Sequence, residues 1–132
     1  MLSSDYGFTR TFPDIRLNQA RERIVEALKK EGFGILTEID VKETLKTKLD
    51  VNFRPYVILG ACNPPIAHKA LTAEPAIGLL LPCNVVVAET DDGATEVSVV
   101  KPEAMFSLVK NPSMKPLAQD VTTRLTRALE SA

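Results

Sequence analysis

Residues 54–71, RPYVILGACNPPIAHKAL, join an apolar run directly to a helix start and so decide the centre of the fold. The run at 54–62 is almost continuously apolar, which is typical of a strand that is covered on both faces. We therefore expect a strand near the middle of a sheet. Asn63 is a typical helix cap, and Pro64 suits the first helical position, where a missing N–H costs nothing. The helix should continue over residues 66–74.

The chain before this segment predicts a long amphipathic helix between two strands. Leu17, Ala20, Ile24 and Leu28 recur at spacings of three and four, which is the apolar stripe of a helix. Gly32 is placed to end that helix in a left-handed conformation. The two strands are expected at residues 3–12 and 33–39.

A short helix should follow the second of these strands. Asp40 and Glu43 have the spacing of a capping box, and Val41, Leu45 and Leu49 form an i, i+4, i+8 stripe. We therefore expect a short amphipathic helix over residues 41–49.

The second half of the chain predicts a hairpin and a closing helix. Apolar runs at 84–89 and 94–100 are separated by Asp91, Asp92 and Gly93, a composition typical of a hairpin turn. The closing helix is indicated by apolar residues that lie four apart. They are Leu117, Val121, Leu125 and Leu129.

These elements predict an α+β fold in one domain that spans residues 1–132. Each long helix has one apolar stripe and needs one apolar surface, so both should cover the same face of a single sheet. The sheet is expected to be mainly antiparallel, with four to five strands and short connecting helices. The opposite face carries apolar runs too, and a second copy of the chain is its simplest cover.

Composition excludes several classes of protein. The chain has 132 residues, 45% hydrophobic, with 16 basic and 17 acidic residues and a formal net charge of −1. Nucleic-acid surfaces need clustered Lys and Arg, which are missing here. The longest apolar run, residues 76–81, is far shorter than a membrane span. We expect a cytoplasmic protein with two reduced cysteines.

Two Cys-Asn pairs and one histidine form the candidate site. Cys62-Asn63 and Cys83-Asn84 each stand at the edge of an apolar run, and His68 lies in the helix between them. Taken together, these five residues predict a pocket that recognises a small polar or aromatic ligand through a few polar groups in an apolar wall. Our preferred interpretation is a non-enzymatic domain that binds or senses a small molecule.

Other interpretations of the same residues remain open. Cys62, Cys83 and His68 would suit a thiol-dependent enzyme, or a three-ligand site for Zn(II) or Cu(I) with one open position. An anion at the start of the helix is disfavoured, because Pro64 and Pro65 remove two backbone donors. A purely structural homodimer is the third alternative, in which the cysteines simply pack.

Three segments of the chain resemble one protein family. They are GFGILTEIDVKETL, YVILGACNPPIAHKAL and IGLLLPCNVVVAE. The resemblance is to the domain-of-unknown-function family numbered 302, which comprises small, mostly bacterial and archaeal proteins. It covers nearly the whole chain and is weakest in the first dozen residues. The resemblance implies a compact α+β domain that is dimeric and has no assigned function, and it supplies no catalytic residue.

Overall fold

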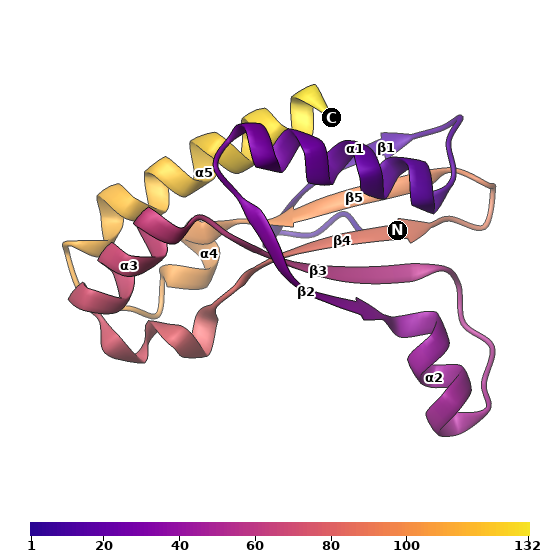
Figure 1. Cartoon of the computed structure of the whole chain (residues 1–132), viewed down its shortest axis with the longest axis horizontal. Coiled ribbons are helices and arrows are strands. Elements are labelled where there is room, and N and C mark those ends of the chain that lie inside the picture. The colour runs from indigo at the N-terminus through magenta and orange to yellow at the C-terminus, as the bar shows by residue number, and fades with distance from the viewer.

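A computed structural model describes residues 1–132 and contains one sheet of five antiparallel strands in the order β1-β5-β4-β3-β2 (Figure 1). The strands are β1 (Gly7–Phe12), β2 (Gly34–Asp40), β3 (Tyr56–Cys62), β4 (Cys83–Glu89) and β5 (Thr95–Val100). The helices are α1 (Leu17–Lys30), α2 (Val41–Leu49), α3 (Pro64–Ala73), the 3₁₀ helix η1 (Pro75–Leu80), α4 (Pro102–Phe106) and α5 (Met114–Ser131). The predicted α+β class and the antiparallel sheet are confirmed.

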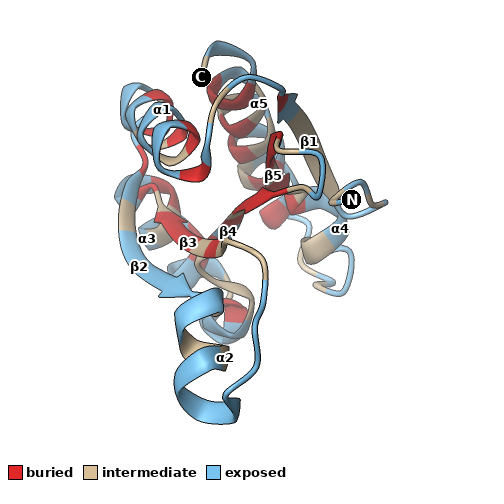
Figure 2. Ribbon diagram, turned by 90° about the vertical axis from the view of Figure 1, so that its right-hand side faces the viewer, coloured by how far each residue is buried: buried red, intermediate tan, exposed pale blue.

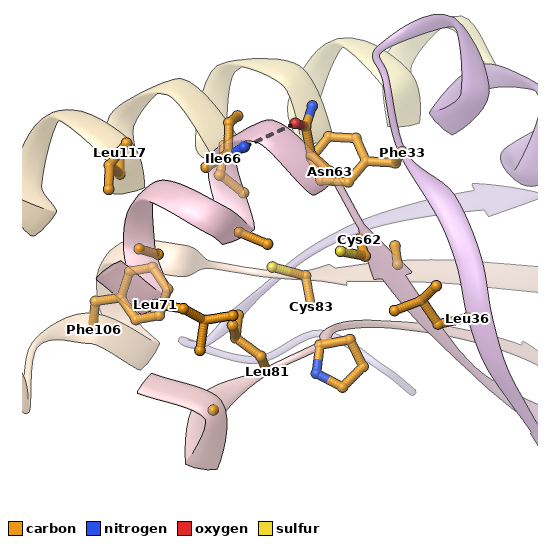
Figure 3. A pocket seen from close by; sticks show the side chains of 16 residues that line it. Phe33, Leu36, Cys62, Asn63, Ile66, Leu71, Leu81, Cys83, Phe106 and Leu117 are labelled. Atoms are coloured by element: carbon orange, nitrogen blue, oxygen red, sulfur yellow. Dashed lines mark hydrogen bonds between the residues drawn. The ribbon is translucent and has the colours of Figure 1, made fainter. Parts of the chain in front are cut away.

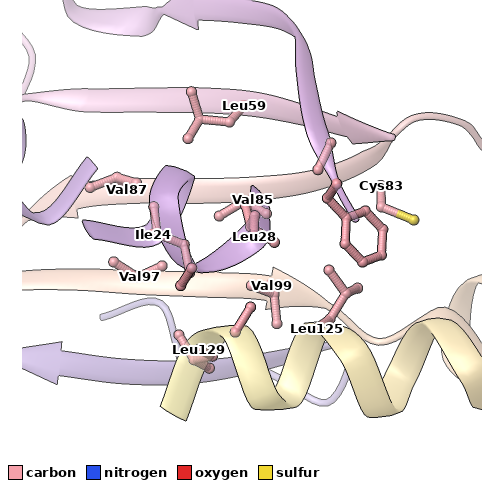
Figure 4. Close-up of a cluster of buried hydrophobic side chains, with 14 of the residues drawn as sticks. Ile24, Leu28, Leu59, Cys83, Val85, Val87, Val97, Val99, Leu125 and Leu129 are labelled. Atoms are coloured by element: carbon pink, nitrogen blue, oxygen red, sulfur yellow. The ribbon is translucent and has the colours of Figure 1, made fainter. Parts of the chain in front are cut away.

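The core lies between one face of the sheet and the two long helices. In Figure 1, α1 and α5 lie on the same side of the strands, as the apolar stripes predicted. Alternate residues of β3, β4 and β5 point at them, and Figure 4 shows these side chains meeting those of the helices. Fully buried members are Ile24, Leu28, Leu59, Val85, Val87, Val97, Val99 and Leu125. Each such side chain contributes about 1.5–3 kcal/mol through removal from water.

Side chains distant in sequence stabilise the ends of both long helices. Helix α1 has no local side-chain cap, and the buried carboxylate of Glu89 accepts a hydrogen bond from Leu17 N at 3.0 Å instead. At the far end of α5, the Arg10 guanidinium donates to the carbonyl oxygens of Leu129, Glu130 and Ala132. An anion at a helix N-terminus and a cation at a C-terminus both complement the helix dipole.

The outer face of the sheet is only partly covered. Tyr56, Ile58 and Val86 on this face are half-buried, while the next residue along each strand is buried against the helices. The backbone of Leu2 donates to Glu96 at 2.8 Å and so holds the first residues of the chain over this face.

The structure corrects three details of the sequence prediction. The central strand is β4, and β3 is second from the edge, with one face half-exposed. The first strand begins at Gly7, and residues before it form only an isolated bridge between Ser4 and Gly7. The short helix α4 had no apolar period long enough to predict it.

Strand β2 is an edge strand of the sheet, and helix α2 and the following loop extend away from it (Figures 1 and 2). We call residues 34–53 the arm. Asp40 caps α2 as predicted, because its Oδ1 accepts from Glu43 N at 3.0 Å. The expected apolar stripe of α2 nevertheless meets no core, and no residue of α2 is buried. Large apolar residues exposed on this arm are Leu36, Ile39, Leu49, Val51 and Phe53.

Candidate functional site

A pocket of about 290 Å³ lies where β3 ends and β4 begins, beside α3 and α5 (Figure 3). Sixteen residues line it, 13 of them hydrophobic, and none carries a charge. Figure 3 shows Phe33 and Ile66 on one side of the two cysteines and Leu81 on the other. The volume lies near the lower end of the range for small-molecule sites.

Strands β2 and β3 pack closely against Pro82 next to the pocket. A Cβ at Gly60 would lie 2.6 Å from Pro82 Cγ and closer still to Thr37 Oγ1. Only a glycine lets the backbone of β3 approach β2 and the proline ring this closely. Gly60 therefore fixes the relative positions of Cys62 and Cys83 at the edge of the pocket.

Asn63 directs its hydrogen bonds into the protein. Its Oδ1 accepts from Ile66 N at 3.3 Å, which makes it the N-cap of α3 as predicted. Its Nδ2 donates to the carbonyl oxygen of Glu31 at 3.4 Å, just beyond the end of α1. The side chain is buried, with both polar ends engaged, so Asn63 joins α1 to α3.

The two cysteines are free thiols that differ in burial. Cys83 is 6% exposed, and Cys62 is half-buried. Burial raises the pKa of Cys83 to about 11, and the neighbouring Cys62 raises it further. Cys83 is therefore a neutral thiol at pH 7, and it behaves as part of an apolar wall.

Three of the five predicted site residues line this pocket, and two do not. Cys62, Asn63 and Cys83 line it. His68 is exposed and does not line the pocket, because α3 presents Ile66, Ala67, Ala70 and Leu71 to it instead. Asn84 is exposed on the outer face of the sheet, because successive residues of a strand point to opposite faces.

The structure therefore does not bring together Cys62, Cys83 and His68, the three ligands of the alternative metal site. His68 lies on the solvent side of α3, because the face of α3 that lines the pocket carries Ile66, Ala67, Ala70 and Leu71. No group of three or more His, Cys, Asp or Glu side chains converges anywhere in the structure.

Most of the pocket wall was missed by sequence reasoning. Leu36 reaches it from an irregularity in the pairing of β2 with β3, between Ile35 and Thr37. Leu81, which directly follows η1, and Phe106, the last residue of α4, also reach it. No local sequence pattern marks these three as pocket residues, whereas Leu117 of the predicted closing helix was already recognised as apolar.

The family comparison agrees with the fold. The sequence model of the family described as "Domain of unknown function DUF302" matches residues 8–132. The chain belongs to the DUF302 family. Its relatives include an uncharacterised protein of Aquifex aeolicus (strain VF5), which is 29% identical over an alignment 127 residues long. The match covers 86% of this chain and 84% of that protein.

A solved structure of the same family has the same architecture. The crystal structure of an uncharacterised conserved DUF302 protein from Bacillus stearothermophilus superimposes with a TM-score of 0.88 and 32% sequence identity. The match covers 97% of this chain and 98% of that one. Within the DUF302 chain described here, no helix combines the length and the apolar character needed to cross a membrane.

Proposed function

We propose that this DUF302 protein binds a small apolar molecule in the pocket beside Cys62 and Cys83, and acts as a binding or sensing domain. The observation that carries the proposal is a chemically uniform wall with 13 hydrophobic residues of 16. An apolar ligand would gain free energy there by leaving water, at about 25 cal/mol for each Å² of its buried surface. We propose a cytoplasmic location, in agreement with two free thiols.

The chemistry of the cysteines favours binding over catalysis. A nucleophilic cysteine requires a thiolate, and burial raises the pKa of Cys83 to about 11. A partner base is also missing from the pocket, since His68 is exposed on α3 and does not line it. Catalysis by the Cys83 thiol would need both features to change on substrate binding.

The test uses a fluorescent naphthalene dye that brightens in apolar surroundings, together with mass spectrometry of the native protein. We expect one dye per chain, or a retained small molecule that the dye displaces. Ala67→Phe should abolish binding, because Ala67 lines the pocket and the added ring would fill it. Ala73→Phe is the matched control, with the same change on an exposed position of the same helix. Equal dye binding by both variants would contradict the proposal.

We also propose that two copies of the chain associate through the arm formed by residues 34–53. In a single copy of the chain, no residue of α2 is buried. An isolated helix of nine residues is only marginally stable in water. Contact with a second copy would bury the exposed apolar residues of the arm.

The charges of the arm suit a second copy as the partner. The arm has one more acidic than basic residue: Glu38, Asp40, Glu43 and Asp50 against Lys42, Lys46 and Lys48. A nearly neutral surface of mixed sign can meet its own copy without strong like-charge repulsion.

Sedimentation equilibrium tests this second proposal. We expect a dimer for the native chain and a monomer for the double variant Leu49→Lys, Phe53→Lys. Leu108→Lys is the control, because Leu108 is also exposed and lies outside the arm. A native chain that stays monomeric at about 0.1 mM would overturn the proposal, as would a dimer that the arm variant leaves intact.

A further inference from the structure

We infer that the ligand of the pocket is a flexible aliphatic chain, bound by its hydrocarbon part while its polar head stays in water outside. The inference rests on the proposed function and names the chemical class of the ligand. It follows from the polar groups in the pocket wall, from the exposed leucines at its rim, and from its volume.

The interior offers a ligand no charged group and no free amide. Asn63 is the one amide side chain of the wall, and its Oδ1 and Nδ2 already bond to Ile66 N and to the Glu31 carbonyl within the protein. A hydroxyl, carboxylate or amine that entered would lose its bonds to water without an adequate replacement, which is strongly unfavourable. The part of the ligand inside the pocket is therefore hydrocarbon.

The rim continues the apolar surface outward. Leu36 and Leu71 both line the pocket, yet they are 67% and 42% exposed. Leu79 follows the lining residue Gly78 in sequence and is 89% exposed. Single exposed leucines are ordinary, but Leu36 and Leu71 are part of the wall of an apolar pocket. A chain that leaves the pocket can therefore keep apolar contact at the rim.

The volume sets the length of chain that fits inside. A methylene takes about the volume of one water molecule in the liquid, roughly 30 Å³. A cavity of about 290 Å³ therefore holds roughly ten carbon atoms. Affinity should rise about fourfold with each added methylene until the cavity is full, and should level off beyond that length.

Because no charge lines the pocket, the sign of the head group should matter little. An octyl chain that carries a hydroxyl, a carboxylate or a trimethylammonium group should bind with affinities within a few fold of one another. This separates the site from fatty-acid sites that hold the carboxylate with an arginine or lysine, where the cation would be rejected.

The experiment measures displacement of the naphthalene dye by n-alkanols from hexanol to tetradecanol, each below its solubility limit. We expect the fourfold steps to end near ten to twelve carbons, and we expect Ala67→Phe to remove them. Octanoate and octyltrimethylammonium are then compared with octanol in the same assay.

The outcomes separate the inference from the proposed function. If the dye binds the native chain but not Ala67→Phe, and no alkanol displaces it, the aliphatic assignment is overturned and pocket binding stands. A strong preference for one charged head group would overturn the assignment in the same way. If neither dye nor alkanol binds, both the assignment and the proposed function fail.

Discussion

Raising the pH from about 8 to about 11 should destabilise the native chain more than a Cys83→Ala variant. The unfolded chain releases the Cys83 proton near the ordinary pKa of 9.0, whereas burial holds that pKa at about 11 in the fold. Above pH 9 the unfolded state gains stability because its Cys83 thiol loses the proton. In the folded state the same thiol stays protonated up to about pH 11. The stability that is linked to the raised pKa of Cys83 is therefore fully present below pH 9 and is lost by about pH 11.

The size of the effect follows from the same two values. A shift from 9.0 to about 11 spans roughly two units, and each unit corresponds to about 1.4 kcal/mol. The linked free energy is therefore at most about 2–3 kcal/mol. This is a large share of the stability of a typical small domain, which is about 5–15 kcal/mol.

The assay is urea unfolding followed by far-UV circular dichroism at steps of half a pH unit. All other ionisable groups are common to the native chain and the variants, so the quantity to compare is the difference between them. Cys83→Ala should lose about 2–3 kcal/mol less than the native chain between pH 8 and 11. Cys62→Ala removes the other thiol of the pocket, and it should keep most of the native loss. Parallel pH curves for the native chain and Cys83→Ala would refute the buried, neutral state of this thiol.

Two further substitutions test how the pocket is held, each read from the free energy of unfolding in urea. Gly60→Ala should cost about 1–3 kcal/mol, because its Cβ would collide with the ring of Pro82 and the side-chain hydroxyl of Thr37 on β2. Gly34→Ala is its control and should be neutral or stabilising, because nothing lies within 4 Å of the added atom; equal effects would contradict the packing described. Asn63→Ala should cost about 1–2 kcal/mol through the lost cap of α3. A loss no larger than that of Asp40→Ala, which uncaps the exposed helix α2, would show that the bond from Asn63 to α1 contributes nothing.

Local patterns predicted the elements that depend on local physics. The spacing of Leu17, Ala20, Ile24 and Leu28 located α1, and Gly32 ends it with a positive φ of 87°. The Asn63-Pro64 cap located α3 equally well. In each case the determining interactions lie within a few residues, so the sequence contains them directly.

The remaining features depend on contacts between distant segments. Glu89 caps α1 from a different strand, and no spacing in the sequence indicates that pairing. The stripe of α2 has the right period for burial, but the helix extends from the edge of the sheet and finds no core within one chain.

The candidate site shows the same division. The sequence predicted that the two Cys-Asn turns would come together, and Cys62, Asn63 and Cys83 do line one pocket. The directions of His68 and Asn84 were missed, because each depends on which face of its helix or strand meets the protein. The pocket wall is more apolar than the two asparagines suggested, since Asn63 is engaged within the protein.

The most direct measurement is an isotope-filtered NMR experiment with unlabelled decan-1-ol and protein labelled at its methyl groups. If the pocket binds an aliphatic chain, the decanol methylenes should give nuclear Overhauser effects to methyl groups of Ala70, Leu117 and Val121, which line it from two helices. Effects confined to Leu49 and Val51 on the arm, or none at all, would contradict the account.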